Sequence, residues 1–231
     1  MNKDKQNEIL KIVKANYEEI AETFDETREK PIWPPLLEML KGVGRGERVL
    51  DVGCGNGRIL KALSEQGAEY IGVDQSRRLV DICRQKYPKS KFERLDIASL
   101  GDLSEYDFDW VFCVAVLHHL PGFDLRLQAL KQLKNKIKDD GRIVLTVWNM
   151  WSEEKFRKMI WKFFLLKLLR RNQMDFGDVL FDWKRGGVTS KRYYHAFRSC
   201  ELKRIVKKAG LKIEKITRDR FNYYLILVKK N

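Results

Sequence analysis

The sequence predicts an α/β fold with a mostly parallel sheet, because two patterns occur together after Glu47. Short apolar strands alternate there with helical stretches, as in successive βαβ units. Three alternate glycines, Gly53, Gly55 and Gly57, follow the first strand, and glycine allows positive φ angles and a close approach to a ligand. The 231 residues, 44% of them hydrophobic, suit one domain, 1–231, with a core of ordinary size.

The individual elements follow from apolar periodicity along the chain. Apolar residues at steps of three and four predict a helical N-terminal cap over residues 1–45. Seven strands are expected, at 48–53, 70–74, 91–95, 108–114, 141–148, 212–217 and 223–228. Helices are expected at 57–66, 76–87, 123–138 and 197–209. The last two strands, joined by a polar turn, predict a C-terminal antiparallel hairpin at the sheet edge.

Residues 151–196 interrupt this alternation, and we expect them to form an insertion over a substrate cleft. Within them, the basic and apolar segment 153–171 has only a narrow polar stripe, which includes Lys158 and Lys162. Such a segment suits a cap over the cleft, a partner surface or a helix that lies on a membrane. The sequence leaves these three interpretations open.

Two acids accompany the glycine loop and indicate a nucleoside-type ligand. Asp51 lies in the first strand, and Asp74 closes the next one, where an acid commonly binds a ribose diol. Residue 58 is arginine, so the G-x-G-x-x-G fingerprint of dinucleotide enzymes is not met. A structural turn between strand and helix is the alternative interpretation of the glycines.

Composition and charge restrict the setting and the partners. Four cysteines without C-x-x-C pairs favour a reducing, cytoplasmic location, and no metal site is expected. The polar N-terminus is unlike a signal peptide, and no apolar run reaches membrane-spanning length. Of the net charge of +14, residues 184–231 carry +12, with 15 Lys and Arg against 3 Asp and Glu. This basic block favours a polyanion partner, nucleic acid first, over a merely solvated surface.

The loop Val49-Leu-Asp-Val-Gly-Cys-Gly-Asn-Gly57 resembles motif I of the S-adenosylmethionine-dependent methyltransferases with the seven-stranded Rossmann-like fold. The resemblance implies that Asp51 lies near the amino acid end of S-adenosylmethionine and that Asp74 binds its ribose. It places Asp96 and Ile97 at the adenine, although a helix N-cap is a competing interpretation of Asp96. The resemblance also implies that Val114, which ends the fourth strand, and His118, which follows it, lie near the sulfonium, while the adjacent His119 is expected to be structural.

Narrower motifs resemble the tRNA wobble-uridine 5-carboxymethyl methyltransferases. They are the N-terminal signature from Tyr17 to Arg28, Ala115-Val-Leu-His118-His119 with Arg126 behind it, and Arg192-Tyr-Tyr-His195. Phe181-Asp182, where the family usually has Val-Pro, and the residues before Glu201 depart from the family pattern. The resemblance implies methylation of the carboxylate of a 5-carboxymethyl-type uridine in the tRNA anticodon loop.

A carboxylate of ordinary pKa, about 4, is ionised at neutral pH and needs an orienting clamp rather than a base. The resemblance therefore implies acceptor-binding and catalytic roles for Arg126, Arg192, His195, His118 and Tyr194. Tyr17 and Arg28 are expected at the cofactor, and Arg28 also suits the substrate. Trp33 or Trp183 could stack on a base, with buried packing as the alternative.

Two rival functions remain open from the sequence. One is a methyltransferase of the same fold that acts on a small molecule or a quinone-like lipid. The other is an RNA-binding protein or partner subunit without catalysis, which the intact glycines and Asp74 disfavour. Eukaryotic and archaeal members of the resembled family work with a small zinc-binding activator protein, and the sequence leaves open whether this chain needs one.

Overall fold

The computed structural model describes residues 1–27, 31–185 and 188–230. Its main sheet has the strand order β3-β2-β1-β4-β5-β9-β8. The strands are β1 (Arg48–Val52), β2 (Glu69–Asp74), β3 (Lys91–Arg94), β4 (Phe108–Val114), β5 (Ile137–Trp148), β8 (Leu211–Arg218) and β9 (Asn222–Lys229). The first five are parallel, and β9 is antiparallel to both β5 and β8. This confirms the predicted α/β class, the seven strands and the antiparallel C-terminal pair.

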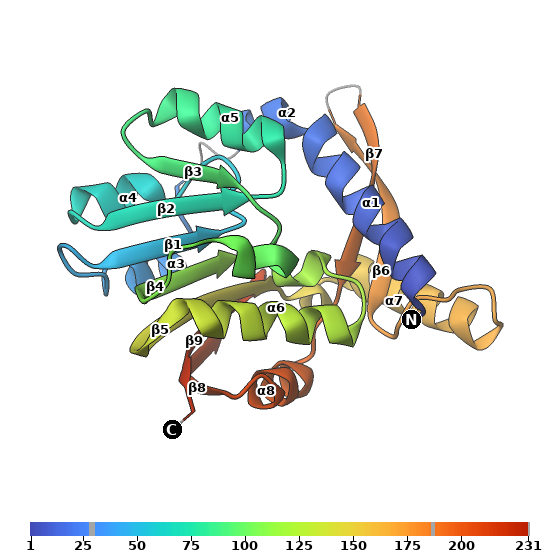
Figure 1. The fold of residues 1–231 in the computed structure, drawn as a ribbon. Helices are drawn as coiled ribbons and strands as arrows, with labels where there is room; N and C mark the ends of the chain where they lie inside the picture. Colours follow the sequence, from blue (N-terminus) through green and yellow to red (C-terminus); the bar gives the residue numbers. More distant parts are fainter. Residues whose placement is uncertain (28–30, 186–187, 231) are drawn as a thin grey trace.

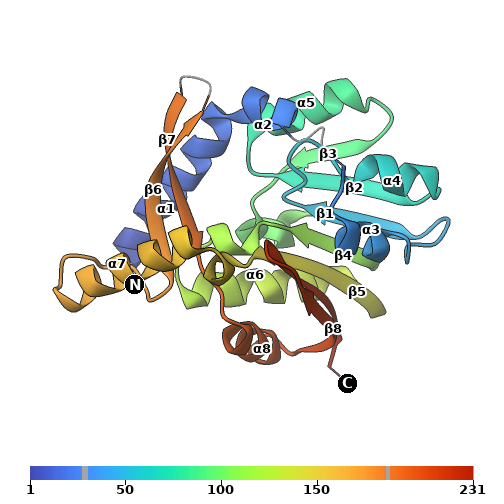
Figure 2. The ribbon, with the colours of Figure 1, turned by 180° about the vertical axis from the view of Figure 1, so that it is seen from behind.

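Helices cover both faces of the sheet (Figures 1 and 2). The helices α6 (Phe123–Lys136) and α8 (Ser199–Lys208), with the 3₁₀ helix η1 (Ile97–Asp102), close one apolar core. The other core lies under α3 (Pro34–Leu40), α4 (Leu60–Glu65) and α5 (Arg77–Lys86). The sheet is thus buried between two helical layers, and its strand ends are left to form a site.

Several expected boundaries differ from the structure, including the start of the strand expected at 141–148, and two of the helix boundaries differ for clear local reasons. α4 begins at Leu60 rather than at 57, because Gly57 has φ +72° and the preceding residues form turns. α6 ends at Lys136 rather than at 138, because Ile137 already pairs with Phe108 and starts β5. A register irregularity between Phe108 and Trp110 absorbs this early start of the strand.

The N-terminal helices α1 (Lys3–Glu19) and α2 (Ala21–Thr27) lie beyond the carboxyl ends of the parallel strands (Figure 1). Polar contacts anchor them on the sheet layers. The Gln6 side chain donates to Asp124 in α6, and the Glu18 carboxylate accepts the backbone N–H of Arg77 at the start of α5. The first helices therefore cover the strand ends.

Residues between β5 and α8 form a separate layer with its own two-stranded sheet. The 3₁₀ helix η3 (Met150–Ser152) and α7 (Glu154–Leu168) precede an antiparallel hairpin of β6 (Asp178–Arg185) and β7 (Val188–His195). The insertion was expected from the sequence, but its two strands were not. The indole Nε1 of Trp151 donates to the carbonyl of Ala196 at 3.0 Å. The first and last residues of the insertion therefore lie next to each other.

The hairpin packs between α1 and α7, because successive side chains of β7 point to opposite faces of the hairpin. Tyr193 packs with Ile9 and Val13 of α1. Tyr194, on the opposite face, packs with Ile160 of α7 and with Met150. The outer face of α7 remains exposed through apolar side chains that include Trp161, Leu165, Leu168 and Leu169. Within the described ranges, no helix is both long enough and apolar enough to cross a membrane.

Candidate active site

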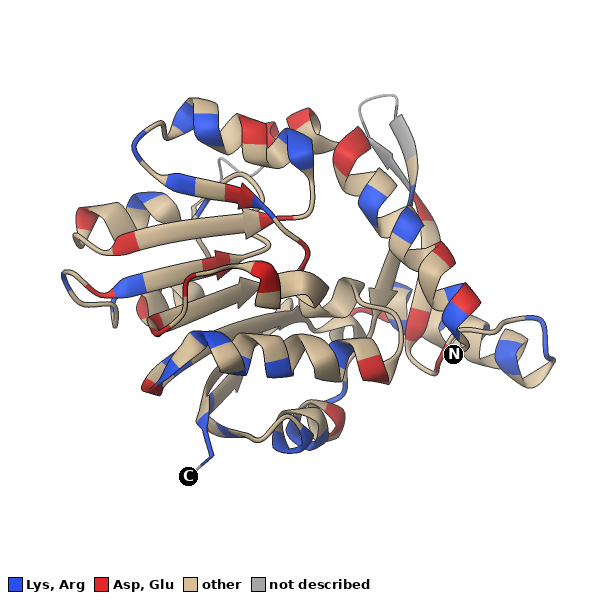
Figure 3. Ribbon diagram, viewed as in Figure 1, with Lys and Arg blue, Asp and Glu red and all other residues tan. Residues whose placement is uncertain are grey.

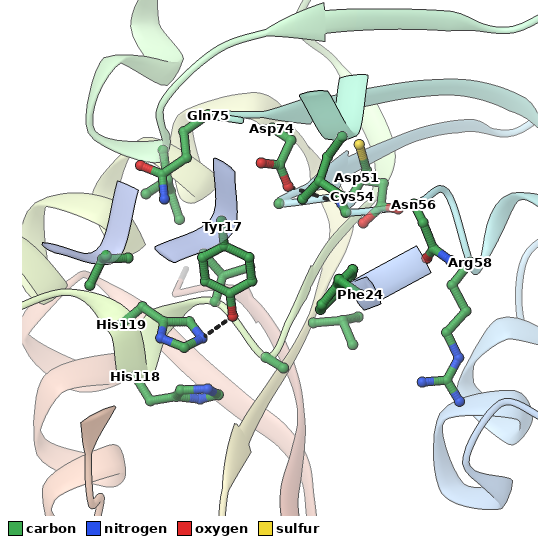
Figure 4. A pocket seen from close by; sticks show the side chains of 18 of the residues that line it. Tyr17, Phe24, Asp51, Cys54, Asn56, Arg58, Asp74, Gln75, His118 and His119 are labelled. Atoms are coloured by element: carbon green, nitrogen blue, oxygen red, sulfur yellow. Dashed lines mark hydrogen bonds between the residues drawn. The ribbon is translucent and has the colours of Figure 1, made fainter. Parts of the chain in front are cut away.

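A cavity of about 1240 Å³, counted to its open mouth, lies at the carboxyl ends of the parallel strands (Figure 4). It is bounded by the sheet, by α1 and α2, and by β7. Most of the residues expected at a site line it: Tyr17, Asp51, Gly53, Gly55, Asp74, Asp96, Ile97, Val114, His118, Arg192 and Tyr194. The fold thus gathers residues from distant segments of the sequence around one hollow.

Two glycines form the wall of the cavity, and both require the absence of a side chain. Gly53 has φ +72°, and a Cβ there would lie 2.3 Å from Cγ2 of Val116. Gly55 has φ +57°, and its Cβ would lie 3.1 Å from Phe24. Gly57 shares the positive φ but lies outside the cavity lining, where a Cβ would meet Tyr87 at 3.0 Å. The loop is therefore shaped for a close backbone approach at two of its three glycines.

The two strand acids lie near the same edge of the sheet because β1 and β2 are parallel neighbours; Asp51 is in register with Gly72, two residues before Asp74. The Asp74 carboxylate accepts the backbone N–H groups of Gly55 and Ser76, each at 2.9 Å. Burial raises the pKa of Asp74 to about 6, although these two hydrogen bonds oppose the rise. Its remaining acceptor capacity suits hydroxyl donors such as those of a ribose.

Asp51 is buried deeper beneath the glycine loop. Burial raises its pKa to about 7; the hydrogen bond from the Tyr70 hydroxyl at 2.8 Å opposes this rise, and the charge of Asp74 adds to it. A carboxyl with such a pKa is readily ionised by a nearby cation. The pair of acids therefore favours a ligand that carries both hydroxyl groups and positive charge.

Asp96 has two roles in the structure. Its side chain accepts the backbone N–H of Ala98 at 2.8 Å and caps η1, as the competing interpretation expected. It also lines the cavity beside Ile97. The cap fixes the carboxylate at the cavity wall, so the two interpretations agree.

The opposite end of the cavity is aromatic. Trp148 and Tyr194 stack with ring centroids 4.6 Å apart and planes at 15°. The His118 ring lies 5.4 Å from that of Tyr194, and Arg192 Nη1 donates to the Tyr194 hydroxyl at 3.4 Å. This end can therefore hold a planar group and an anionic one next to each other.

The two neighbouring histidines have different partners. His118 Nδ1 accepts the backbone N–H of Trp148 at 3.4 Å. His119 contacts the Tyr193 carbonyl through Nδ1 at 3.2 Å and the Tyr17 hydroxyl through Nε2 at 2.8 Å, as Figure 4 shows for the latter. His119 thus joins α1 and β7, which agrees with a structural role, although its ring also lines the cavity.

Arg126 and His195 do not line the cavity, contrary to the expectation that they contact an acceptor. They belong to a buried polar cluster with Asp178 and Glu201. His195 Nδ1 lies 2.6 Å from Asp178 and Nε2 lies 2.9 Å from Glu201, while Arg126 lies 3.7 Å from Asp178. Burial raises the pKa of Glu201, but the contact with His195 and the nearby cationic groups hold it below its usual value.

The alternation of side chains along β7 explains why the residues of the motif Arg192-Tyr-Tyr-His195 lie in two different places. Arg192 and Tyr194 project from one face of β7 into the cavity, so His195 projects from the other face. Sequence spacing alone could not show which face would meet the cavity. A clamp that includes both Arg192 and His195 does not agree with this geometry.

Further expected residues have other outcomes. Arg28 lies outside the described residues, and so does the side chain of Trp183. Trp33 lines the cavity mouth, where the Arg58 guanidinium lies 5.0 Å above its ring. Other lining residues received no site role from the sequence: Phe24, Asn56, Arg58, Gln75 and Trp148. Of these, Gln75 directly follows a strand end, which is the position that could have indicated it.

The comparisons with known proteins agree with this geometry. A profile of the methyltransferase domain family matches residues 20–216. The chain is 28% identical over 222 residues to the tRNA (carboxymethyluridine(34)-5-O)-methyltransferase of Schizosaccharomyces pombe, which covers 92% of this chain and 94% of that protein. It is 34% identical over 163 residues to the Mus musculus tRNA (carboxymethyluridine(34)-5-O)-methyltransferase ALKBH8, which covers 70% of this chain.

The chain spans 22% of the length of that mouse protein. Among solved structures, a SAM-dependent methyltransferase from Methanosarcina mazei has the same fold. Its TM-score is 0.71 at 18% sequence identity, with 87% of this chain and 99% of that one covered.

Proposed function

Because the chain belongs to the methyltransferase domain family, we propose that it methylates the carboxylate of a 5-carboxymethyl-type wobble uridine in tRNA. The methyl donor is S-adenosylmethionine. The names of the fission yeast and mouse relatives support the acceptor, and the fission yeast protein aligns over nearly its whole length. The observation that carries the proposal is the placement of Arg192 and Tyr194 at the aromatic end of the cavity, opposite the paired acids.

At the cofactor end, we propose one task for each residue. Asp74 accepts the ribose hydroxyls, Asp51 lies at the amino acid end, and Asp96 with Ile97 holds the adenine. Val114, at the end of β4, lies beside the methyl-bearing sulfur. Other residues proposed here are the two wall glycines of the loop, together with Tyr17 and Arg28.

At the acceptor end, Arg192 and Tyr194 orient the carboxylate. When bound, S-adenosylmethionine would supply an electrophilic methyl group to an oxygen of this carboxylate, which is already ionised and has no proton to lose. Residues that hold this oxygen in line with the methyl provide much of the rate enhancement. Arg126 and His195 act as positioning residues, since their cluster fixes the base of β7.

The polyanion surface is the basic C-terminal block. Figure 3 shows Lys and Arg gathered on α8, and their exposed members are Lys203, Arg204, Lys207 and Lys208. Such side chains bind phosphate oxygens without reading the sequence. The tRNA anticodon loop would then enter the cavity, with insertion 151–196 covering its acceptor end. The cap 1–45 covers the cofactor.

The test is a methylation assay with isotopically labelled S-adenosylmethionine. The substrate is tRNA that carries unesterified carboxymethyluridine, and the product nucleoside is identified by mass spectrometry. We expect a base-labile methyl ester on that uridine and no label on tRNA with an unmodified wobble uridine.

Label in small-molecule extracts but not in tRNA would instead support the small-molecule or lipid rival. Absence of S-adenosylmethionine binding would support the non-catalytic one. A parallel reaction with a small zinc-binding activator protein tests whether this chain needs that partner, because activity would then appear only in the mixture.

A further inference from the structure

His118 has a polar atom without a hydrogen-bond partner among the residues that the structure describes. The side chain is fully buried and lines the cavity, and the unpaired atom is Nε2. Its other nitrogen, Nδ1, accepts the Trp148 backbone N–H and so holds the lone pair. The ring proton of a neutral imidazole is then on Nε2, at the acceptor end of the cavity. A buried donor without a partner is costly, so this one points to a ligand that supplies an acceptor.

The ring stays neutral in these surroundings. Burial holds the pKa of His118 well below its ordinary value, and the neighbouring imidazoles of His119 and His195 lower it further. The groups that face the ring are His119 on the same turn, Trp148 on β5, and Tyr194 on β7. Of these neighbours, none is a carboxylate that would favour an imidazolium.

Both ring nitrogens of His119 have hydrogen-bond partners in the protein. A carbonyl can only accept, so His119 Nδ1 donates its proton to Tyr193 O. In the neutral ring, Nε2 then accepts the hydroxyl proton of Tyr17. Both histidine lone pairs at this end are therefore engaged with protein donors, which leaves neither ring placed to take a proton from an acceptor.

We propose that His118 binds the acceptor as a neutral proton donor, with Nε2–H on a carboxylate oxygen, and does not act as a general base. This inference rests on the proposed function and restricts its substrate class to acceptors that arrive already ionised. A neutral donor suits the reaction, because the carboxylate loses its charge as the ester forms. A second full positive charge would stabilise the ground state more than the transition state.

The tautomer can be measured without any substrate. The chain has three histidines, so long-range ¹⁵N–¹H spectra of histidine-labelled protein can be assigned with one substitution for each. We expect His118 to show a protonated Nε2 and an unprotonated Nδ1 from pH 6 to 8. An imidazolium, or a proton on Nδ1, would overturn the proposal, whatever the true methyl acceptor.

Kinetics on the tRNA substrate test the contact itself. His118→Leu removes the donor, whereas His118→Gln keeps an N–H near the Nε2 position. We expect kcat/KM to fall about ten- to a hundredfold for His118→Leu and several-fold less for His118→Gln, with S-adenosylhomocysteine affinity unchanged in both.

The pH profile separates a donor from a base. For the wild type and His118→Gln, the profiles of kcat/KM should have the same shape. An acidic limb, meaning a fall of kcat/KM toward low pH, that is present only in the wild type would indicate a base and overturn the assigned contact. An equal fall in kcat/KM in the two variants would also overturn it. If the wild type itself leaves the tRNA unlabelled, the proposed function fails while the tautomer measurement still decides the state of His118.

Discussion

The smallest decisive feature is the missing side chain of Gly53. A Cβ at this position would lie 2.3 Å from Val116, whereas a Cβ at Gly46, which has a similar φ of +78°, would meet nothing within 4 Å. Gly53→Ala should therefore lower S-adenosylhomocysteine affinity at least tenfold, because the cavity wall must shift. Gly46→Ala carries only the cost of its backbone angle, about 1 kcal/mol of unfolding free energy, and should bind normally. Calorimetric titration of both variants measures this difference, and equal affinities would contradict it.

The pKa of Asp74, about 6, predicts a pH dependence of cofactor binding. Ribose hydroxyls donate to the ionised carboxylate, so affinity should rise between pH 5 and 7 and then level off as this group finishes ionising. Asp74→Asn should lower the affinity about a hundredfold at pH 7.5, since it removes hydrogen bonds to a charged acceptor. It should also remove the step near pH 6.

Titration calorimetry with S-adenosylhomocysteine from pH 5 to 8 checks both parts of this prediction. The same substitution at exposed Asp81, on the neighbouring helix α5, serves as the control and should leave the profile unchanged. A step below pH 7 should remain in Asp74→Asn, because Asp51 still titrates but its pKa is no longer raised by the Asp74 charge. A wild-type affinity that is flat with pH would show that Asp74 is not the ribose ligand.

At the scale of elements, the buried cluster around Arg126 joins α6, β6, β7 and α8. Arg126 is 1% exposed, and its removal would leave the Asp178 carboxylate buried with a weaker compensating charge. Arg126→Met should therefore lower the unfolding free energy by about 3–5 kcal/mol. The matched change at Arg142, which is about 41% exposed and pairs with Glu214, should cost less than about 1 kcal/mol. Urea unfolding of both variants checks the contrast, and similar destabilisation of the two would contradict it.

The elements also show where sequence reasoning stops. Glycines, strand acids and apolar strands have local signatures. The sheet, and the glycines and acids that line one end of the cavity, were predicted from these signatures. The face that β7 presents depends on which helix packs against each side, and this is a tertiary property. Arg192 and His195 therefore looked equivalent in the sequence, although only Arg192 lines the cavity. The chemistry of His118 depends on its contact with the Trp148 backbone, which has no sequence signature.

At the scale of the whole molecule, the sequence alone shows in which residues the excess positive charge lies. Of the 15 Lys and Arg in residues 184–231, seven lie at exposed positions of α8 and β8. If α8 binds phosphates, Lys207→Gln with Lys208→Gln should weaken tRNA binding and make it less sensitive to salt. The slope of log K against log salt should fall by about 0.7–0.9 for each phosphate that the variant no longer neutralises.

Fluorescence anisotropy with labelled tRNA at several salt concentrations measures this slope. A double variant on the other helical layer, Lys41→Gln with Lys61→Gln, removes the same charge from exposed positions of similar kind. Identical slopes in the two double variants would show that net charge, rather than α8, governs the binding.

The shared exit and return of the insertion, which the hydrogen bond between Trp151 and Ala196 marks, has an evolutionary consequence. A segment with adjacent ends can be exchanged for another without moving the strands that support it. Here the exchangeable segment carries Arg192 and Tyr194, which we propose to bind the acceptor, while the glycine loop and the strand acids stay with the sheet. In this architecture, the insertion can therefore change with the substrate, while the sheet with its glycine loop keeps the site for the methyl donor.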